Sequence, residues 1–101
     1  MTAFGGRSRN ELEQDVLASM VLVKPFRMRA LPRILSGNFT TSEHVRLYKA
    51  MRRLDRLDID DGPMFVARTL GVSLDAAEAW LMNSIVTDYD GDLERLLHAD
   101  A

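Results

Sequence analysis

Residues 34–57 constrain the fold more than any other segment, because they combine a chain break, a helix start and a long amphipathic helix. Thr40 and Glu43 have the spacing of a capping box, so we expect a helix to begin just after Thr40. Mostly apolar side chains then recur every three or four residues, which predicts one face packed against a core. The residues of this face are His44, Leu47, Tyr48, Met51 and Leu54. The opposite face is basic and carries Arg46, Lys49, Arg53 and Arg56.

Helical periodicity also runs through the chain before this segment. We expect a first helix from Asn10 or Glu11 to Lys24–Pro25, because proline disfavours helical conformation in the residue before it. Glu11, Glu13 and Asp15 fall in its opening turns, where their charges suit the positive end of the helix dipole. A second, shorter helix should follow. Its expected buried side consists of Met28, Leu31, Ile34 and Leu35.

Capping signals define three more helices after residue 57. Asp61 can cap a fourth helix, and Pro63 suits its first turn. Gly71 can end this helix, because glycine readily adopts the left-handed backbone conformation common after the last helical residue. Ser73 should cap a fifth helix, and a short sixth helix follows over residues 93–98. No alternating strand pattern and no internal repeat occurs. The sequence therefore predicts an all-α fold, a small orthogonal bundle of about five to six helices.

Composition limits the domain organisation and the class of protein. Of the 101 residues 47% are hydrophobic, which suits one core, so we expect a disordered tail over residues 1–9 and a single helical domain over 10–101. The absence of cysteine excludes disulfides, thiolate metal sites and a cysteine nucleophile. No apolar run approaches the roughly 18 residues needed to cross a bilayer, and residues 1–11 lack the apolar core of a signal peptide. We expect a soluble, cytoplasmic protein.

Motifs of catalysis and of cofactor binding are missing from the sequence. It contains no GxxxxGK[ST] phosphate loop, no GxGxxG, no HExxH and no GxSxG. Two acidic clusters, residues 58–61 and 88–92, lack the spacing of a calcium-binding EF-hand. We interpret both as turn and helix-start residues, and we expect no metal site, no cofactor and no enzyme activity.

Charge is divided unevenly along the chain. Residues 1–57 contain eleven lysines and arginines against five acidic residues, whereas residues 58–101 contain two against ten. Such asymmetry can attract an acidic partner to one side or favour head-to-tail self-association. Alternatively, the two halves neutralise each other after folding.

Residues 10–18, NELEQDVLA, and the later segment 34–51 follow one another in a characteristic order and spacing. The first is similar to N-x-E-A-E-Q-x-V-L-G, and the second to L-x-x-x-x-F-y-x-x-x-H-x-x-I-f-x-A-m, with Phe39 and His44 at the matching positions. Residues 57–70, with Ile59–Asp60, are similar to a third motif that begins l-x-x-x-g-x-p-I-D. Together these segments resemble the N-terminal domain of DnaB-type replicative DNA helicases.

Several positions depart from that family pattern. Ala18 stands in place of the usual glycine, Thr40 in place of the tyrosine after the phenylalanine, and Gly62–Pro63 disturbs a valine–threonine turn. A glycine pair and a tyrosine–leucine step that normally start the next helix are missing, so the similarity after residue 70 is limited to hydrophobic pattern. The sequence also ends before any RecA-like motor domain, so we expect a collar domain without the ATP-dependent motor domain.

The resemblance implies a helicase N-terminal-domain-like bundle that takes part in DNA replication without catalysis. Such domains pair through a helical hairpin, form the collar of a hexameric ring and contact primase or loader proteins. Here the hairpin would be the fifth and sixth helices, unless its apolar residues are simply buried. The expected oligomer interface consists of Trp80, Met82, Ile85, Val86, Leu93, Leu96 and Leu97.

The expected partner-binding residues are Arg46, Lys49, Arg53 and Arg56, unless that face is only solvated. A second hypothesis is a small DNA-binding or regulatory protein that lays the same basic face on phosphates. The acidic second half and the lack of an aromatic stacking platform make direct nucleic-acid binding the less favoured of the two. We expect His44 to be a hydrogen-bonded structural residue rather than a proton switch, and Phe39 to fill the bundle between the second and third helices.

Overall fold

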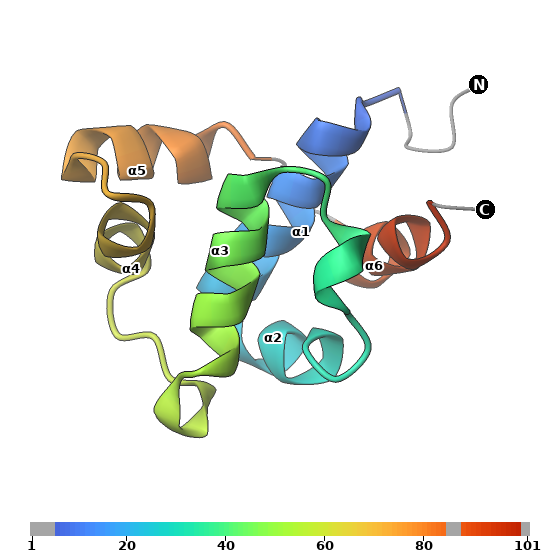
Figure 1. Cartoon of the computed structure of the whole chain (residues 1–101), viewed down its shortest axis with the longest axis horizontal. Coiled ribbons are helices and arrows are strands. Elements are labelled where there is room, and N and C mark those ends of the chain that lie inside the picture. The colour runs from blue at the N-terminus through green and yellow to red at the C-terminus, as the bar shows by residue number, and fades with distance from the viewer. Residues whose placement is uncertain (1–5, 85–87, 100–101) are drawn as a thin grey trace.

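The computed structural model describes residues 6–84 and 88–99, which form six α-helices (Figure 1). The helices are α1 (Arg9–Leu22), α2 (Lys24–Ala30), α3 (Ser42–Arg52), α4 (Gly62–Leu70), α5 (Leu74–Met82) and α6 (Tyr89–Leu97). Two 3-10 turns, η1 (Ser36–Asn38) and η2 (Asp55–Leu57), flank α3. No strand occurs in this part of the chain. The prediction of a small all-α bundle is confirmed.

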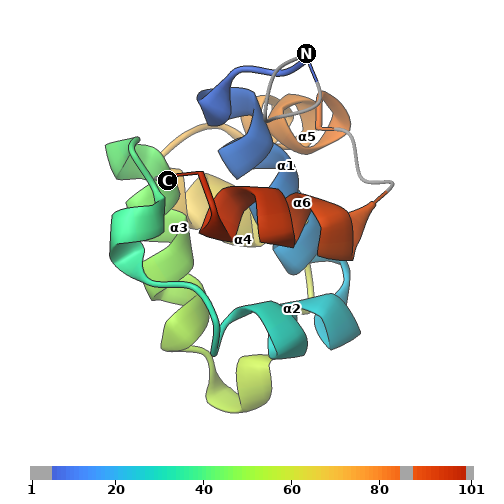
Figure 2. The same ribbon diagram turned by 90° about the vertical axis from the view of Figure 1, so that its right-hand side faces the viewer.

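Helix α1 forms the centre of the bundle. It packs against α2, α3 and α6, and Figure 2 shows α6 lying across it. Buried side chains occur around its circumference, as expected for a helix enclosed by others. The buried residues of α1 are Leu12, Glu13, Asp15, Val16, Leu17, Ala18, Ser19, Met20 and Val21. Two carboxylates, at positions 13 and 15, therefore lie inside the protein and need partners there.

A helical hairpin is formed by α4 and α5, which pack against each other, while α4 also packs against α3. Gly71 joins the two helices with a φ of 69°, a left-handed conformation that glycine adopts without steric cost. Helix α6 instead packs against α1 and α2, on the other side of the molecule from α5 (Figure 1). The expected hairpin of the fifth and sixth helices is thus wrong.

Three of the predicted helix starts and ends are confirmed. The carboxylate of Asp61 accepts the Met64 N–H at 3.0 Å, and the hydroxyl of Ser73 accepts the Ala76 N–H at 3.1 Å. Gly71 ends α4 as expected. These signals are local, because a capping side chain reaches only two or three residues along the chain.

The capping box predicted at Thr40 is wrong. Helix α3 begins at Ser42, and its N-cap residue, Thr41, makes no capping hydrogen bond with its side chain. The Thr40 N–H and hydroxyl both donate to the carboxylate of Glu13 instead, at 3.0 Å and 2.6 Å. The buried carboxylate of Glu13, on another helix, thus accepts the Thr40 N–H that a box would direct to Glu43, and it also binds the hydroxyl that would have accepted the Glu43 N–H.

A capping box does occur at the start of α1. The Ser8 hydroxyl accepts the Glu11 N–H and the Glu11 carboxylate accepts the Ser8 N–H, both at 3.1 Å. Residues 7–9 are therefore part of the folded domain, not of the predicted tail. The hydrogen bonds that Ser8 makes with Glu11 also lower the pKa of the Glu11 carboxyl group.

The second helix lies earlier in the sequence than expected. Pro25 falls in the first turn of α2, where proline is tolerated, and the helix ends at Ala30. Phe26 and Ala30 are buried, whereas Met28 is 52% exposed and Leu35 is 70% exposed. Of the predicted buried side only Leu31 and Ile34 enter the core.

Candidate interaction surface

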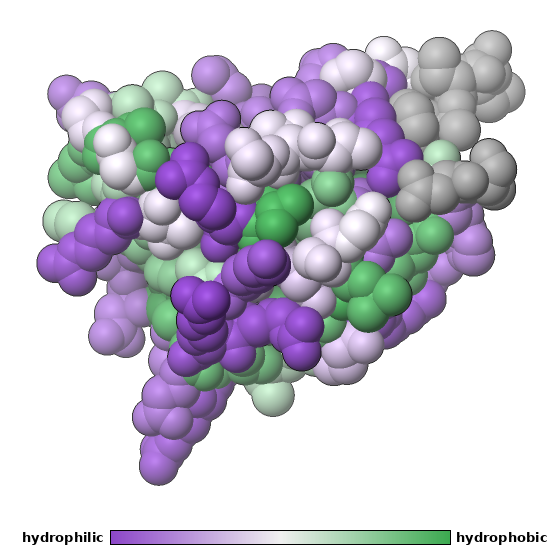
Figure 3. All heavy atoms as spheres, in the orientation of Figure 1, coloured by the Kyte–Doolittle hydropathy of each residue, from purple (hydrophilic) through white to green (hydrophobic). Residues whose placement is uncertain are grey.

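The outer face of α3 and the turn after it carry exposed basic side chains. Arg46, Lys49, Arg53 and Arg56 are all exposed, and none forms an ion pair with a residue in the described ranges. Figure 3 shows hydrophilic side chains gathered over α3 and over the turn below it. The structure thus leaves the four predicted partner-binding residues exposed, Arg46, Lys49 and Arg53 at spacings of three and four along α3 and Arg56 in the following turn, and we call this set the α3 basic face.

Arg52 lies in the same helix but behaves differently. Its guanidinium carbon lies 5.7 Å from the centroid of the Tyr48 ring, and Nη1 lies 3.4 Å from the Tyr48 hydroxyl oxygen. The Tyr48 hydroxyl in turn donates to the Ile34 carbonyl at 2.5 Å. Arg52 is therefore attached to the protein's own aromatic core, and we exclude it from the α3 basic face.

Basic residues of the first 33 positions pair with acidic residues of the second half. Arg29 reaches Asp90 at 3.4 Å, Arg33 reaches Glu94 at 2.7 Å, and Lys24 pairs with Asp58. The hydrogen bond from Arg33 holds the pKa of Glu94 below its usual value. The two halves therefore neutralise each other in part, as one of the sequence-based interpretations required.

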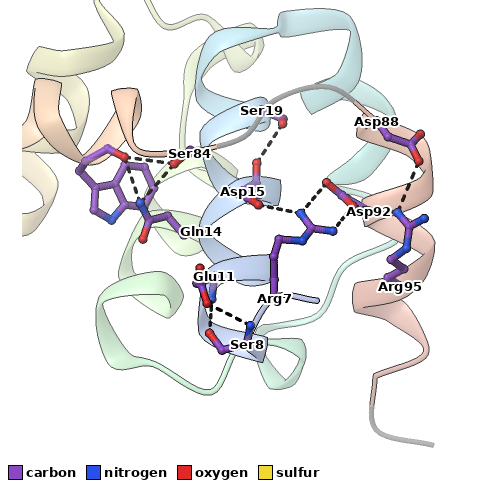
Figure 4. A network of polar contacts seen from close by, with 11 residues as sticks. Arg7, Ser8, Glu11, Gln14, Asp15, Ser19, Ser84, Asp88, Asp92 and Arg95 are labelled. Atoms are coloured by element: carbon purple, nitrogen blue, oxygen red, sulfur yellow. Dashed lines mark hydrogen bonds and ion pairs between the residues drawn. The ribbon is translucent and has the colours of Figure 1, made fainter. Parts of the chain in front are cut away.

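The most buried of these pairings is centred on Arg7 (Figure 4). Its guanidinium donates to Asp92 at 2.6 Å and to Asp15 at 2.6 Å, and both aspartates are buried. Arg95 adds a second cation, 2.8 Å from Asp92. The hydrogen bond with Asp92, and then that with Asp15, raise the pKa of Arg7 against the opposing effect of burial. This cluster joins the start of α1 to α6.

Behind the basic face, α3 is attached to α1 through Glu13 and His44. His44 Nδ1 lies 2.8 Å from Glu13 Oε1, and both side chains are buried. Burial tends to raise the pKa of Glu13, but hydrogen bonds from Thr40 and His44 outweigh it and leave that pKa below its usual value. His44 also makes edge contacts with Phe39 and Trp80, at ring-centroid distances of 6.5 Å and 6.4 Å. His44 thus has a buried acidic partner, as a structural histidine should.

The turn that carries Arg56 has an uncommon backbone. Arg56 has φ 54° and ψ 16°, and Leu57 has φ 57°, so two consecutive non-glycine residues are left-handed. A side chain in this region costs about 1 kcal/mol per residue. Buried Arg27 holds the turn, since its Nε and Nη2 donate to the Leu57 carbonyl at 2.9 Å and 2.6 Å. Burial lowers the pKa of Arg27.

The residues predicted to form an oligomer interface do not share one surface. Leu93 and Leu96 are buried in the core, Trp80 and Leu97 are partly buried against it, and Met82 is 84% exposed. Ile85 and Val86 lie outside the described residues. Met82 borders an open, mostly apolar groove of about 490 Å³. The groove is lined by Leu22, Pro63, Glu78, Leu81, Met82 and Ser84.

No group of three or more His, Cys, Asp or Glu side chains in residues 6–84 and 88–99 is placed to hold a metal ion. Asp61 and Asp88 instead cap α4 and α6, which confirms the interpretation of these two residues as helix-start residues. No helix in the described part of the chain is long and apolar enough to span a membrane. Comparisons with models of protein families, with curated proteins and with solved structures found no match.

Sequence reasoning missed the buried charged residues that connect separate parts of the fold. Glu13 and Asp15 were assigned to the dipole of the first helix, and no feature of residues 10–18 indicated that both are buried. A signal did exist at Ser8 and Glu11, which have the same S-x-x-E spacing that was assigned to Thr40 and Glu43. Arg27 gave no signal, because its acceptors are backbone carbonyls of distant residues.

Proposed function

We propose that this chain is a non-catalytic protein–protein interaction module, similar to the N-terminal collar domain of DnaB-type replicative helicases. It contacts a replicative helicase, a primase or a loader through the α3 basic face. The observation that carries the proposal is that Arg46, Lys49, Arg53 and Arg56 are exposed without an ion-pair partner in the described residues. Exposed charges on a rigid helix increase the rate of association with a partner of opposite charge.

The packing of the motif residues supports the resemblance on which this proposal draws. Glu13, from the segment similar to the family's opening helix, is hydrogen-bonded to His44, from the segment similar to its second motif. Phe39 packs against Tyr48 with ring centroids 5.5 Å apart. Glu13 and His44 are 31 residues apart in the sequence, so the two segments that carry the resemblance pack against each other in one core.

Self-association is a second part of the proposal. Leu22 and Met82 line the groove described above, and they are 52% and 84% exposed. Exposed apolar side chains of this size are typical of surfaces that contact another protein. Light scattering at high concentration tests this part, and a strict monomer would contradict it.

The binding proposal can be tested with a pair of charge reversals. Arg53→Glu changes the α3 basic face, and Arg68→Glu makes the same change at an exposed position of α4 that also lacks an ion pair in the described ranges. We expect Arg53→Glu to weaken binding to purified helicase, primase or loader about tenfold and Arg68→Glu to leave it within about twofold. Equal effects of the two variants, or no binding by the wild type, would contradict the proposal.

The alternative is DNA binding through the same four cations. In that case affinity for duplex DNA should fall steeply with salt, with a log–log slope of roughly −0.9 for each phosphate contacted, or about −4 for four. Two exposed acidic residues without an ion pair in the described ranges, Asp55 and Asp60, lie close to this face in the sequence. Their repulsion of a phosphate backbone is why we place DNA binding second.

A further inference from the structure

The turn between α3 and α4 holds Arg56 in a conformation that arginine rarely adopts. With φ 54° at Arg56 and φ 57° at Leu57, the backbone would suit glycine or asparagine better than either residue present. Strained positions of this kind persist where the surrounding structure determines them, and they gather at binding and catalytic sites. Because Arg56 is exposed, the strain at this position bears on a side chain at the surface rather than on one in the core.

The structure surrounding the turn determines its conformation from three sides. Arg27 is only 2% exposed, and it donates to the Leu57 carbonyl with one part of its guanidinium and to the Met20 and Val21 carbonyls with Nη1. Lys24 pairs with Asp58 on the other side of the turn, and Leu57 packs against the core. The guanidinium of a buried residue thus connects the end of α1 to this turn.

The result of these contacts is the placement of a basic side chain. Arg56 follows the end of α3 by four residues, beyond the C-cap residue Arg53, and both side chains are exposed. Figure 1 shows the turn projecting from the bundle below α3, and Figure 3 shows that the projection is hydrophilic. The turn therefore extends the α3 basic face past the end of the helix.

We infer that the turn 55–58 is an arginine-presenting element, and that Arg56 and Arg53 together bind an acidic segment of a protein partner with separated carboxylates. The inference rests on the interaction function proposed above and names the partner's chemistry. Charge complementarity selects protein over nucleic acid. Asp55 is exposed and has no ion pair in the described residues, so a partner with continuous negative charge would be repelled beside Arg56. Duplex DNA carries one charge about every 1.7 Å, whereas spaced carboxylates can meet the arginines and avoid Asp55.

Substitutions at residue 56 separate the cation from the backbone strain. Arg56→Asn removes the charge and supplies a side chain that tolerates the left-handed region, whereas Arg56→Lys keeps both the charge and the strain. Arg68→Gln is the matched control, because it removes an exposed charge from α4. The probes are a ten-residue peptide of alternating glutamate and serine and a 20-base-pair DNA duplex, each titrated at about 150 mM salt.

We expect Arg56→Asn to weaken peptide binding about three- to fivefold, which is the upper part of the range for one exposed ion pair, while raising the midpoint of unfolding. Arg56→Lys and Arg68→Gln should each retain peptide affinity within about twofold. Unchanged peptide affinity in Arg56→Asn, or a lower unfolding midpoint, would overturn the inference. Tighter binding of the duplex than of the peptide, with the same dependence on Arg56, would overturn the choice of an acidic protein segment.

The proposed function is contradicted by a result other than the one that would overturn the role of Arg56. If the wild-type chain captures no helicase, primase or loader while its binding to the acidic peptide still depends on Arg56, the presenting turn stands and the partner class changes. If it captures one of these proteins and Arg56→Asn captures it equally well, the module stands and the presenting role of Arg56 is wrong. The two ideas are therefore tested by separate measurements on the same variants.

Discussion

The basic residues of positions 7–33 and those of the α3 basic face have opposite surroundings. Arg7, Lys24, Arg29 and Arg33 each reach an acidic residue from positions 58–94, and Arg27 donates to the backbone carbonyls of Met20, Val21 and Leu57. The cations of the α3 basic face have no such partner in the described residues. One basic region forms ion pairs that hold the fold together, and the other is exposed without such pairs in the described residues.

This difference explains how a chain with a small net charge can still carry a charged surface. The formal net charge is −2, so charges nearly cancel in the total. Cancellation occurs where α6 and residue 58 approach α1 and α2, and it does not extend to the outer side of α3. Total charge therefore says little about binding here, and the position of each charge in the fold decides its use.

Removal of Arg7 should have the largest effect on stability, because it leaves Asp15 and Asp92 buried without their shared cation. We expect Arg7→Ala to lower the free energy of unfolding by about 3 kcal/mol, measured by urea denaturation. In an Asp92→Asn background the same change should cost clearly less, since one of the two carboxylates is gone. Additive effects of the two substitutions would show that Arg7 does not act through Asp92.

The pH dependence of stability should differ between the inner side of α3, which Glu13 attaches to α1, and its exposed outer face. Because folding lowers the pKa of Glu13 below its ordinary value of 4.5, the stability that this carboxylate provides is fully present above that pH. It should be lost as the pH falls below about 4.5 and through the lower pKa of the folded state. Glu13→Gln should cost about 2 to 3 kcal/mol at pH 7 and flatten this part of the acid-unfolding curve.

A variant of the outer face provides the control for that titration. Lys49→Gln should keep the acid-unfolding curve of the wild type, because Lys49 has no ion pair with a described carboxylate. If Lys49→Gln also flattened the curve below pH 4.5, the separation between a paired interior and an unpaired outer face would be wrong.

Much of the fold could be predicted from the sequence because its determinants are local. Asp61, Ser73 and Gly71 act within one helical turn of their own positions, and the periodicity of residues 44–54 identified the packed face of α3. The α3 basic face followed from the same periodicity. Its residues are the basic positions that fall opposite the packed face.

Partners far apart in the chain could not be predicted in this way. Glu13 and Thr40 are 27 residues apart, and their hydrogen bond both displaced the expected capping box and placed a carboxylate in the core. Arg7 and Asp92 are 85 residues apart. The strained turn also had no local signal, because Arg56 and Leu57 are left-handed only through contacts made by Arg27 and the core.

Surface substitutions give the smallest effects, and their signs distinguish the two basic regions most directly. Arg33→Gln removes a half-exposed ion pair with Glu94 and should destabilise the protein by about 0.5 kcal/mol. Lys49→Gln should instead stabilise it by about 0.3 kcal/mol at low salt, because repulsion from Arg46, Arg52 and Arg53, three or four residues away, outweighs the attraction of Lys49 to the negative end of the helix dipole. Both effects should shrink in 1 M salt, where screening is nearly complete. Equal signs in thermal unfolding at low salt would mean that the α3 cations stabilise the fold, and the reason for assigning them to a partner would be lost.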